Sequence, residues 1–153
     1  MQRNRKELDS YEYEVFLYIQ DSDQEAVQGL FDKEVCPHRH VRRQDDDFSP
    51  GSKLDWLLEN IQACRWLVPV LSPNFLNDGE CCYFIAQAQY SRPHAIVPVV
   101  WTEFETDDRA FSSLLDTAEP ITWPGNLASE DVKATFWETL LERTESRKAA
   151  KLL

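Results

Sequence analysis

The sequence is poor in basic residues and in glycine. Its 153 residues carry 16 Lys and Arg against 27 Asp and Glu, which gives a formal net charge of −11. A charge of this sign does not attract nucleic acid or anionic lipid at long range, so we expect no nucleic-acid partner. The 4 glycines are too few and too scattered to form a loop that cradles phosphates.

Cysteine is also scarce. The 4 cysteines, Cys36, Cys64, Cys81 and Cys82, show no CxxC pairing and are too few for a disulfide scaffold in a chain of this length. We therefore expect free thiols in a reducing, cytoplasmic setting. Whether Cys81 and Cys82 react stays open, because a helix start would activate a thiol and burial would silence it.

No stretch of the sequence is long and apolar enough to cross a bilayer. The most apolar runs, residues 66–71 (WLVPVL) and 95–101 (AIVPVVW), each contain a proline and fall far below the roughly 20 residues required. The N-terminus also lacks the apolar segment of a secretory signal. Three basic residues near it, Arg3, Arg5 and Lys6, suit either a polar terminus or the cytosolic flank of a membrane tether outside this chain.

What the sequence does contain is enough apolar material for one domain. Hydrophobic residues make up 42% and aromatic residues 12% of the chain, which suffices for a single core. We expect the domain to span residues 13–146. Residues 1–12 would then form an N-terminal flank and residues 147–153 a C-terminal tail.

Short apolar runs alternate with amphipathic segments along the chain. Residues 14–19 (EVFLYI), 66–71 and 95–101 are typical of buried strands. Apolar residues three and four apart predict helices between and after them, at residues 24–34, 54–64, 75–90 and 129–146. This alternation favours a mostly parallel sheet with helices on both faces.

Several segments give weaker signals. Residues 38–43 alternate only weakly, and residues 102–117 are polar without a clear period. Residues 72–74 (SPN) indicate a turn, and Gly79 is expected to break the first turn of the helix that follows. Residues 120–124 (PITWP) are typical of an edge strand, because proline cannot donate to a central ladder.

The last helix carries an apolar face and an adjacent aromatic pair. The side chains expected to point inward are Val132, Phe136, Trp137, Leu140 and Leu141. At neighbouring helical positions one ring can be fully inside and the other at the margin, so core packing is the expected role of Phe136 and Trp137.

The most unusual stretch is an acidic turn. It consists of Asp45, Asp46, Asp47, Phe48, Ser49, Pro50 and Gly51. Consecutive carboxylates cannot all face one point, and the chain lacks the glycine and later ligands of a calcium loop. Cys36, His38 and His40 alternate as residues of one strand face would, but they offer three ligands at best. We expect no metal and no cofactor.

A recognition role suits the acidic turn better. Pro50 fixes one backbone dihedral and Gly51 relaxes the next, so a short loop can project with Phe48 near its tip. A projecting aromatic flanked by charge can anchor a protein interface. Arg42 and Arg43 precede the acids and create a dipolar surface suited to head-to-tail association. The alternative is that Phe48 packs on its own helix and the charges are merely solvated.

Four segments resemble ordered motifs of the Toll/interleukin-1 receptor (TIR) domains of animal innate immunity. Residues 13–19 (YEVFLYI) are similar to the first-box strand, and residues 47–51 (DFSPG) to the second-box Arg-Asp-x-x-Pro-Gly. Residues 70–75 (VLSPNF) resemble Leu-Ser-x-x-Phe, and Phe136-Trp137 resembles the third-box Phe-Trp. The resemblance covers nearly the whole chain and implies a flavodoxin-like α/β fold, with a five-stranded parallel sheet between helices.

The resemblance also implies a function. It indicates a signalling scaffold that forms homotypic contacts with other TIR domains, either as the cytosolic part of a Toll-like or interleukin-1-type receptor or as an adaptor. The loop at 45–51 would make these contacts. Secondary interaction or structural roles fall to Arg42, Arg43, Cys81, Phe136 and Trp137.

Departures from the family pattern bear on enzymatic activity. Asp46 replaces the second-box arginine, and residues 80–84 (ECCYF) align with Trp-Cys-x-x-Glu, so that Phe84 replaces the glutamate. In TIR domains that cleave NAD this glutamate is the implied catalytic residue, and phenylalanine cannot accept a ribose hydroxyl or stabilise an oxocarbenium-like centre. We expect no enzymatic activity.

Two other interpretations stay open. In the first, Glu80 acts as a displaced acid for NAD cleavage, because it lies one helical turn before Phe84 on roughly the same face. In the second, the chain is a flavodoxin-like domain that binds a small ligand at the carboxyl edge of its sheet.

Overall fold

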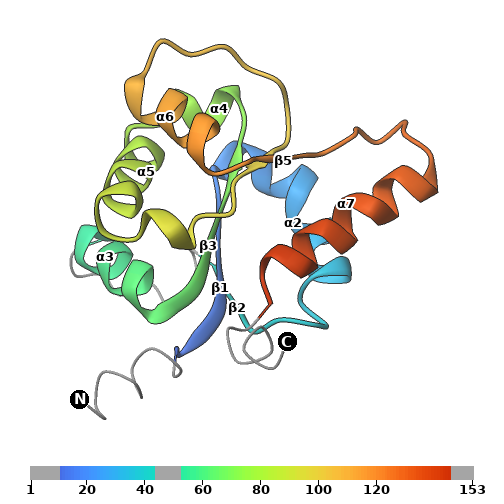
Figure 1. Ribbon diagram of the computed structural model, residues 1–153, viewed down its shortest axis with the longest axis horizontal. Helices are drawn as coiled ribbons and strands as arrows, with labels where there is room; N and C mark the ends of the chain where they lie inside the picture. Colours follow the sequence, from blue (N-terminus) through green and yellow to red (C-terminus); the bar gives the residue numbers. More distant parts are fainter. Residues whose placement is uncertain (1–10, 44–52, 146–153) are drawn as a thin grey trace.

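A computed structural model of the protein describes residues 11–43 and 53–145, in which five strands form one parallel sheet (Figure 1). The spatial order is β2-β1-β3-β4-β5. The strands are β1 (Tyr13–Ile19), β2 (Val41–Arg43), β3 (Cys64–Leu71), β4 (Val99–Val100) and β5 (Ile121–Thr122). All four strand pairings are parallel, which confirms the predicted α/β fold.

Helices cover both faces of this sheet. The α-helices are α2 (Gln24–Glu34), α3 (Lys53–Ala63), α4 (Pro73–Leu76), α5 (Gly79–Ser91), α6 (Arg109–Thr117) and α7 (Glu130–Arg143). Two 3₁₀ turns, η1 (Asp21–Asp23) and η2 (Pro93–Ala95), complete the described elements. Helices α3 to α6 lie on one face and α2 and α7 on the other (Figure 1). None of the helices in the two described ranges is long and apolar enough to span a bilayer.

Strand β1 divides the core into two halves. Phe16 and Tyr18 pack with residues of α3, α5 and α6, whereas Val15, Leu17 and Ile19 pack with residues of α2 and α7. This division follows from the two-residue period of a strand, whose side chains alternate between faces. Because both faces of β1 are covered, its residues 15–19 are all apolar instead of alternating with polar residues.

The strands and long helices lie close to their predicted positions. Helix α2 has the predicted bounds, and β5 is an edge strand. Strand β2 forms only over the last three residues of the segment 38–43. Strand β4 is shorter than the apolar run 95–101, because Ala95 ends η2 and Pro98 has no N–H to donate.

Two short helices differ from the prediction: α4 joins part of the predicted turn 72–74 to the first two residues of the predicted helix 75–90, and α6 lies in the segment 102–117, which had no clear period. Residues 73–76 form α4 instead of continuing a turn, because the Ser72 hydroxyl accepts a hydrogen bond from Phe75 N at 3.1 Å. Asp108 likewise caps α6 by accepting from Ala110 N at 2.8 Å. The expected break near Gly79 is confirmed, although Gly79 itself begins α5 and the interruption consists of Asn77 and Asp78.

The buried faces of two helices differ from the apolar pattern. In α3, Leu54 is 46% and Leu58 37% exposed, while the buried stripe runs through Trp56, Leu57, Asn60 and Ile61. In α7, Val132 was expected to point inward and is 50% exposed, which makes that prediction wrong. Val132 lies in the first turn of α7, which extends beyond the sheet (Figure 1).

Candidate functional site

The acidic turn at 45–51 lies outside the described residues, so its expected contacts stay a prediction. Both elements beside it are described. Strand β2 ends at Arg43 and helix α3 begins at Lys53. The turn therefore connects the carboxyl end of an edge strand to the start of a helix, as the family resemblance implies.

The two arginines before the turn make contacts within the domain, on opposite faces of β2. The Arg42 guanidinium lies over the rings of Tyr13 and Trp56, at 5.2 and 5.3 Å, and its Nε donates to Asn60 Oδ1 at 3.1 Å. Arg43 forms an ion pair with Asp32 of α2. These contacts give both arginines a structural role, because they hold β2 against its neighbours.

Phe84, which the resemblance aligns with the family glutamate, lies in the middle of an aromatic cluster. Its ring is fully buried and stacks on Tyr18, with centroids 4.4 Å apart and planes at 5°. Phe16 meets it edge-on at 5.6 Å. An ionised carboxylate in this environment would lose its hydration without gaining a partner. The packing around residue 84 therefore favours an aromatic ring over an acid.

Glu80, the acid one turn earlier, lies in the first turn of α5. Its Oε1 is 2.8 Å from Lys53 Nζ, and the hydrogen bond that Lys53 donates to Glu80 raises the pKa of the Lys53 ammonium. Both side chains are partly exposed, so this ion pair contributes at most about 1 kcal/mol to stability.

Side chains at the carboxyl edge of the sheet bind one another. Gln20, which follows β1, donates through Nε2 to Asp78 Oδ2 at 3.1 Å, across 58 residues of sequence. This hydrogen bond, with those from the backbone N–H groups of Cys81 and Glu80, lowers the pKa of the Asp78 carboxyl group despite partial burial. The loops that follow β1 and β3 are thus tied together.

A second link joins the same two loops. Asp23 accepts a hydrogen bond from the Ser72 hydroxyl and another from Asn74 Nδ2 at 2.9 Å. Within residues 11–43 and 53–145, no three His, Cys, Asp or Glu side chains are placed to hold a metal ion. The hydrogen bonds that Asp23 and Asp78 accept fix the geometry of the two loops.

The environment of Cys81 and Cys82 disfavours the reactive thiolate form. Cys81 is buried, and its burial together with the charges of Asp78 and Glu80 raises the pKa of its thiol. Burial also raises the pKa of Cys82 above its ordinary value, and the charge of Asp108 adds to this. Because the thiolate is the reactive form, burial outweighs any activation by the start of α5.

Phe136 and Trp137 are both buried in the core on the other face of the sheet. Trp137 meets Phe31 of α2 edge-on at 5.1 Å, and Phe136 meets Trp123 at 5.1 Å. They pack α7 against α2 and the segment after β5. A substitution at either position would therefore act on folding before it acts on any surface.

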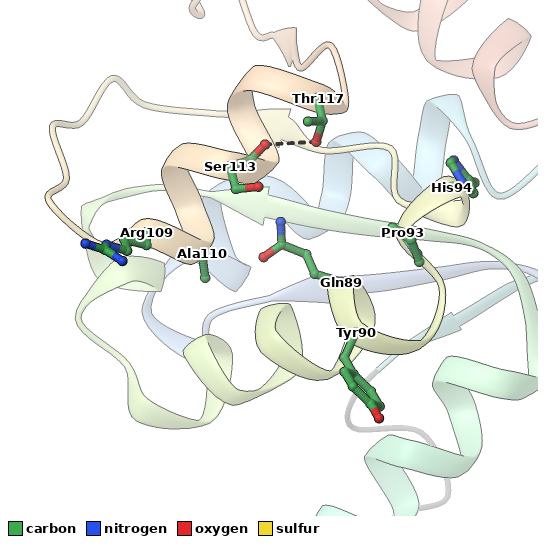
Figure 2. Close-up of a pocket in the computed structure, with 8 residues that line it drawn as sticks. All are labelled: Gln89, Tyr90, Pro93, His94, Arg109, Ala110, Ser113 and Thr117. Atoms are coloured by element: carbon green, nitrogen blue, oxygen red, sulfur yellow. Dashed lines mark hydrogen bonds between the residues drawn. The ribbon is translucent and has the colours of Figure 1, made fainter.

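A groove that no sequence pattern predicted lies between α5 and α6. It has a volume of about 630 Å³ and is lined by Gln89, Tyr90, Pro93, His94, Arg109, Ala110, Ser113 and Thr117 (Figure 2). Gln89 extends toward α6, whereas Tyr90 points away from it and is 89% exposed. The lining comes from three elements with no common period, so no sequence pattern could have indicated it.

Comparison with models of known protein families identifies the family of the chain. The family model described as "TIR domain" matches residues 6–151. The chain belongs to the TIR-domain family. No curated protein sequence matches it.

Solved TIR structures share this fold at low sequence identity. The TIR domain of the Toll-related receptor TRR-2 from Hydra magnipapillata is 20% identical, with a TM-score of 0.68, over 85% of this chain and 96% of that chain. A TIR-STING receptor from C. gigas is 19% identical (TM-score 0.61, 83% of this chain and 40% of that chain). The TIR domains of the activated Roq1 resistosome are 20% identical (TM-score 0.54, 87% and 84%). At these identities the likeness concerns the fold alone.

Proposed function

We propose that this TIR domain is a cytoplasmic signalling scaffold that assembles with other TIR domains and does not cleave NAD. The observation that supports the proposal is the ring of Phe84, which is buried and stacked on Tyr18. The family resemblance aligns this residue with the family glutamate. A site without that carboxylate lacks the group that would act on the ribose.

Glu80 is poorly placed to take over. Four residues along a helix correspond to a displacement of roughly 6 Å along its axis. A misplacement of about 1 Å can already cost a hundredfold in rate. The Glu80 carboxylate is also engaged by Lys53 at 2.8 Å.

The expected contact surface includes the acidic turn at 45–51, with the arginines of β2 on its N-terminal side. Negative and positive side chains adjacent in one surface suit heterologous contacts between copies or between related domains. The similar structures come from a Toll-related receptor, a TIR-STING receptor and a resistosome. These similarities support a role in receptor-linked signalling, with receptor or adaptor TIR domains as partners.

The second candidate function is NAD cleavage with Glu80 as the acid. It is favoured by one observation, that Glu80 lies near the carboxyl end of the sheet, beside the capping residue Asp78. In open α/β sheets ligands bind outside the carboxyl ends of the strands. A carboxylate in that place is worth testing directly.

The deciding experiment measures nicotinamide release by the purified chain at high concentration, together with light scattering. We expect concentration-dependent assembly and no release. Phe48→Ala and Pro50→His should weaken assembly without changing the melting temperature. Nicotinamide release that is lost in Glu80→Ala would overturn the proposal and favour the enzyme. If assembly persists in both loop variants, the acidic turn is not part of the interface.

A further inference from the structure

The groove between α5 and α6 contains no carboxylate, although the chain as a whole is acidic. None of its 8 lining residues is Asp or Glu, whereas these two residue types account for 27 of the 153 residues of the sequence. The lining includes the guanidinium of Arg109 and the imidazole of His94, and both side chains are exposed. The charge of the groove is therefore complementary to an acidic partner.

The polar side chains of the groove are available to a partner. Within residues 11–43 and 53–145, the side chains of Gln89, His94 and Arg109 make no hydrogen bond or ion pair. Gln89 extends toward α6, across the groove (Figure 2). The carboxylate next to Arg109 in the sequence, that of Asp108, caps α6 by accepting hydrogen bonds from Ala110 N at 2.8 Å and Phe111 N at 3.3 Å.

Apolar surface lies between these polar groups. Pro93 and Ala110 line the groove, and the ring of Tyr90 at its rim is 89% exposed. The volume of about 630 Å³ falls within the range of about 300–1,000 Å³ that is typical of ligand clefts. The groove thus suits a short acidic segment that also carries an apolar side chain.

The chain itself contains a segment of this chemistry. Asp45, Asp46 and Asp47 form the only run of three consecutive carboxylates in the sequence, and Phe48 follows them directly. This acidic turn is also the segment for which we propose contacts with other TIR domains. Its three carboxylates match the cationic side chains of the groove, and its aromatic ring matches the apolar surface.

Within one copy, the acidic turn and the groove lie on different sides of α5. The turn leads into α3, whose first residue, Lys53, forms an ion pair with Glu80 of α5 at 2.8 Å. The groove lies on the other side of α5, which is placed between α3 and α6 (Figure 1). To reach the groove of its own chain the turn would have to cross α5, so the groove suits the turn of a second copy.

We propose that the acidic turn of one copy binds in the groove between α5 and α6 of the next copy; this inference rests on the proposed assembly of TIR domains. The carboxylates of the turn would face Arg109 and His94, and Phe48 would cover Pro93 and Ala110. Turn and groove are different surfaces, so the contact is heterologous. Each contact leaves one turn and one groove unoccupied, so the assembly extends beyond a dimer.

A labelled peptide of residues 44–52 (QDDDFSPGS) tests the groove directly. The peptide is titrated with the full chain that carries Phe48→Ala, so that the turn of the chain competes less with the peptide, and fluorescence anisotropy reports binding. We expect saturable 1:1 binding that weakens as salt is added, because exposed charges are screened. The peptide with Asp45→Asn, Asp46→Asn and Asp47→Asn should bind at least about 10-fold more weakly.

Two variants of the chain with the same change in net charge locate the peptide. Arg109→Gln should weaken peptide binding by about 3-fold to 5-fold, the upper range for an exposed ion pair. Ala134→Glu adds one negative charge at an exposed position of α7, on the other face of the sheet, and should change binding by less than about 2-fold. Equal weakening by both variants would mean unspecific attraction and would overturn the inference.

Mixing two assembly-deficient variants tests whether turn and groove are partners. Phe48→Ala impairs the turn, and Ser113→Trp fills the groove without changing its charge. Each variant alone should show weak assembly or none by light scattering. An equimolar mixture should form a 1:1 complex that does not grow with concentration, because only one intact turn and one intact groove are present. Arg109→Glu replaces Ser113→Trp if the tryptophan lowers the melting temperature.

The outcomes separate this inference from the proposed function. If the wild-type chain assembles but the mixture forms no complex, or if Ser113→Trp assembles like the wild type, the turn binds elsewhere and only this inference fails. If the wild-type chain does not assemble, the proposed function fails and the peptide titration decides about the groove. Saturable binding that Arg109→Gln weakens then supports the groove as an acidic-peptide site, and absence of saturable binding overturns it.

Discussion

At the scale of single residues, Phe84 connects the packing of the core with the proposed absence of NAD cleavage. The ring belongs to a cluster in which Phe16, Tyr18 and Phe84 contact one another, so the residue that we propose to stand in place of the family glutamate is part of the core. Aromatic pairs of this geometry contribute beyond the area they bury. Restoring the acid would therefore disturb packing before it could restore catalysis.

Phe84→Glu is expected to lower the free energy of unfolding by about 3 kcal/mol or more, because the ring is lost and an unpaired carboxylate is buried. Urea denaturation followed by circular dichroism measures this change. Ala86→Glu, which adds the same charge at an exposed position of the same helix, should change it by no more than about 0.5 kcal/mol. A fully stable Phe84→Glu protein would show that this position can reach solvent.

At the scale of elements, capping residues decide where helices begin. Asp78 accepts hydrogen bonds from the backbone N–H groups of Glu80 at 2.9 Å and Cys81 at 3.1 Å, and thereby starts α5. Ser129 caps α7 in the same way by accepting from Val132 N at 3.3 Å. The first of these caps also receives the hydrogen bond from Gln20, so it joins a helix start to the loop after β1.

Asp78→Ala should lower the free energy of unfolding by about 1 kcal/mol, and by up to about 2 kcal/mol, because α5 loses its cap. Chemical denaturation at neutral pH measures the loss. Asp78→Asn keeps a capping oxygen and should retain most of the stability. If alanine and asparagine cost the same, the charge of Asp78 and not its capping geometry is what matters.

At the scale of the whole molecule, stability depends on groups that the fold keeps protonated. Burial raises the pKa of the Cys64 thiol to about 12, from an ordinary value of 9.0. It likewise raises the pKa of the Cys81 thiol and of the Tyr18 phenol. A group whose pKa is higher in the folded state contributes stability below its unfolded pKa and loses it as the pH rises.

The free energy of unfolding should therefore fall as the pH rises above about 9, where the unfolded thiols begin to ionise. Asp78 has the opposite sign, since its pKa is lowered, and its contribution is lost as the pH falls through and below 3.8. Denaturation curves across the pH range measure both limbs. Cys81→Ala should make the alkaline fall shallower, and an unchanged slope would contradict the protonation argument.

By itself the sequence determined the fold class and the family. Apolar periodicity reports local geometry, which is why α2 and β1 lie where the pattern of residues 14–34 placed them. The ordered motifs added the TIR assignment, which the family match over residues 6–151 confirms. Helix α4 was predicted only in part, because the capping hydroxyl of Ser72 starts it earlier than the apolar period indicates. Strand β4 was predicted too long, because Pro98 lies within the apolar run 95–101.

Only the tertiary structure decided which side chains meet. The Gln20–Asp78 hydrogen bond, the Lys53–Glu80 ion pair and the groove between α5 and α6 join residues from different elements. Such contacts depend on strand order and on the angle at which each helix packs. The local pattern of apolar and polar residues predicts neither of these. The exposure of Val132 has the same cause, since a helix face is buried only where the sheet extends beneath it.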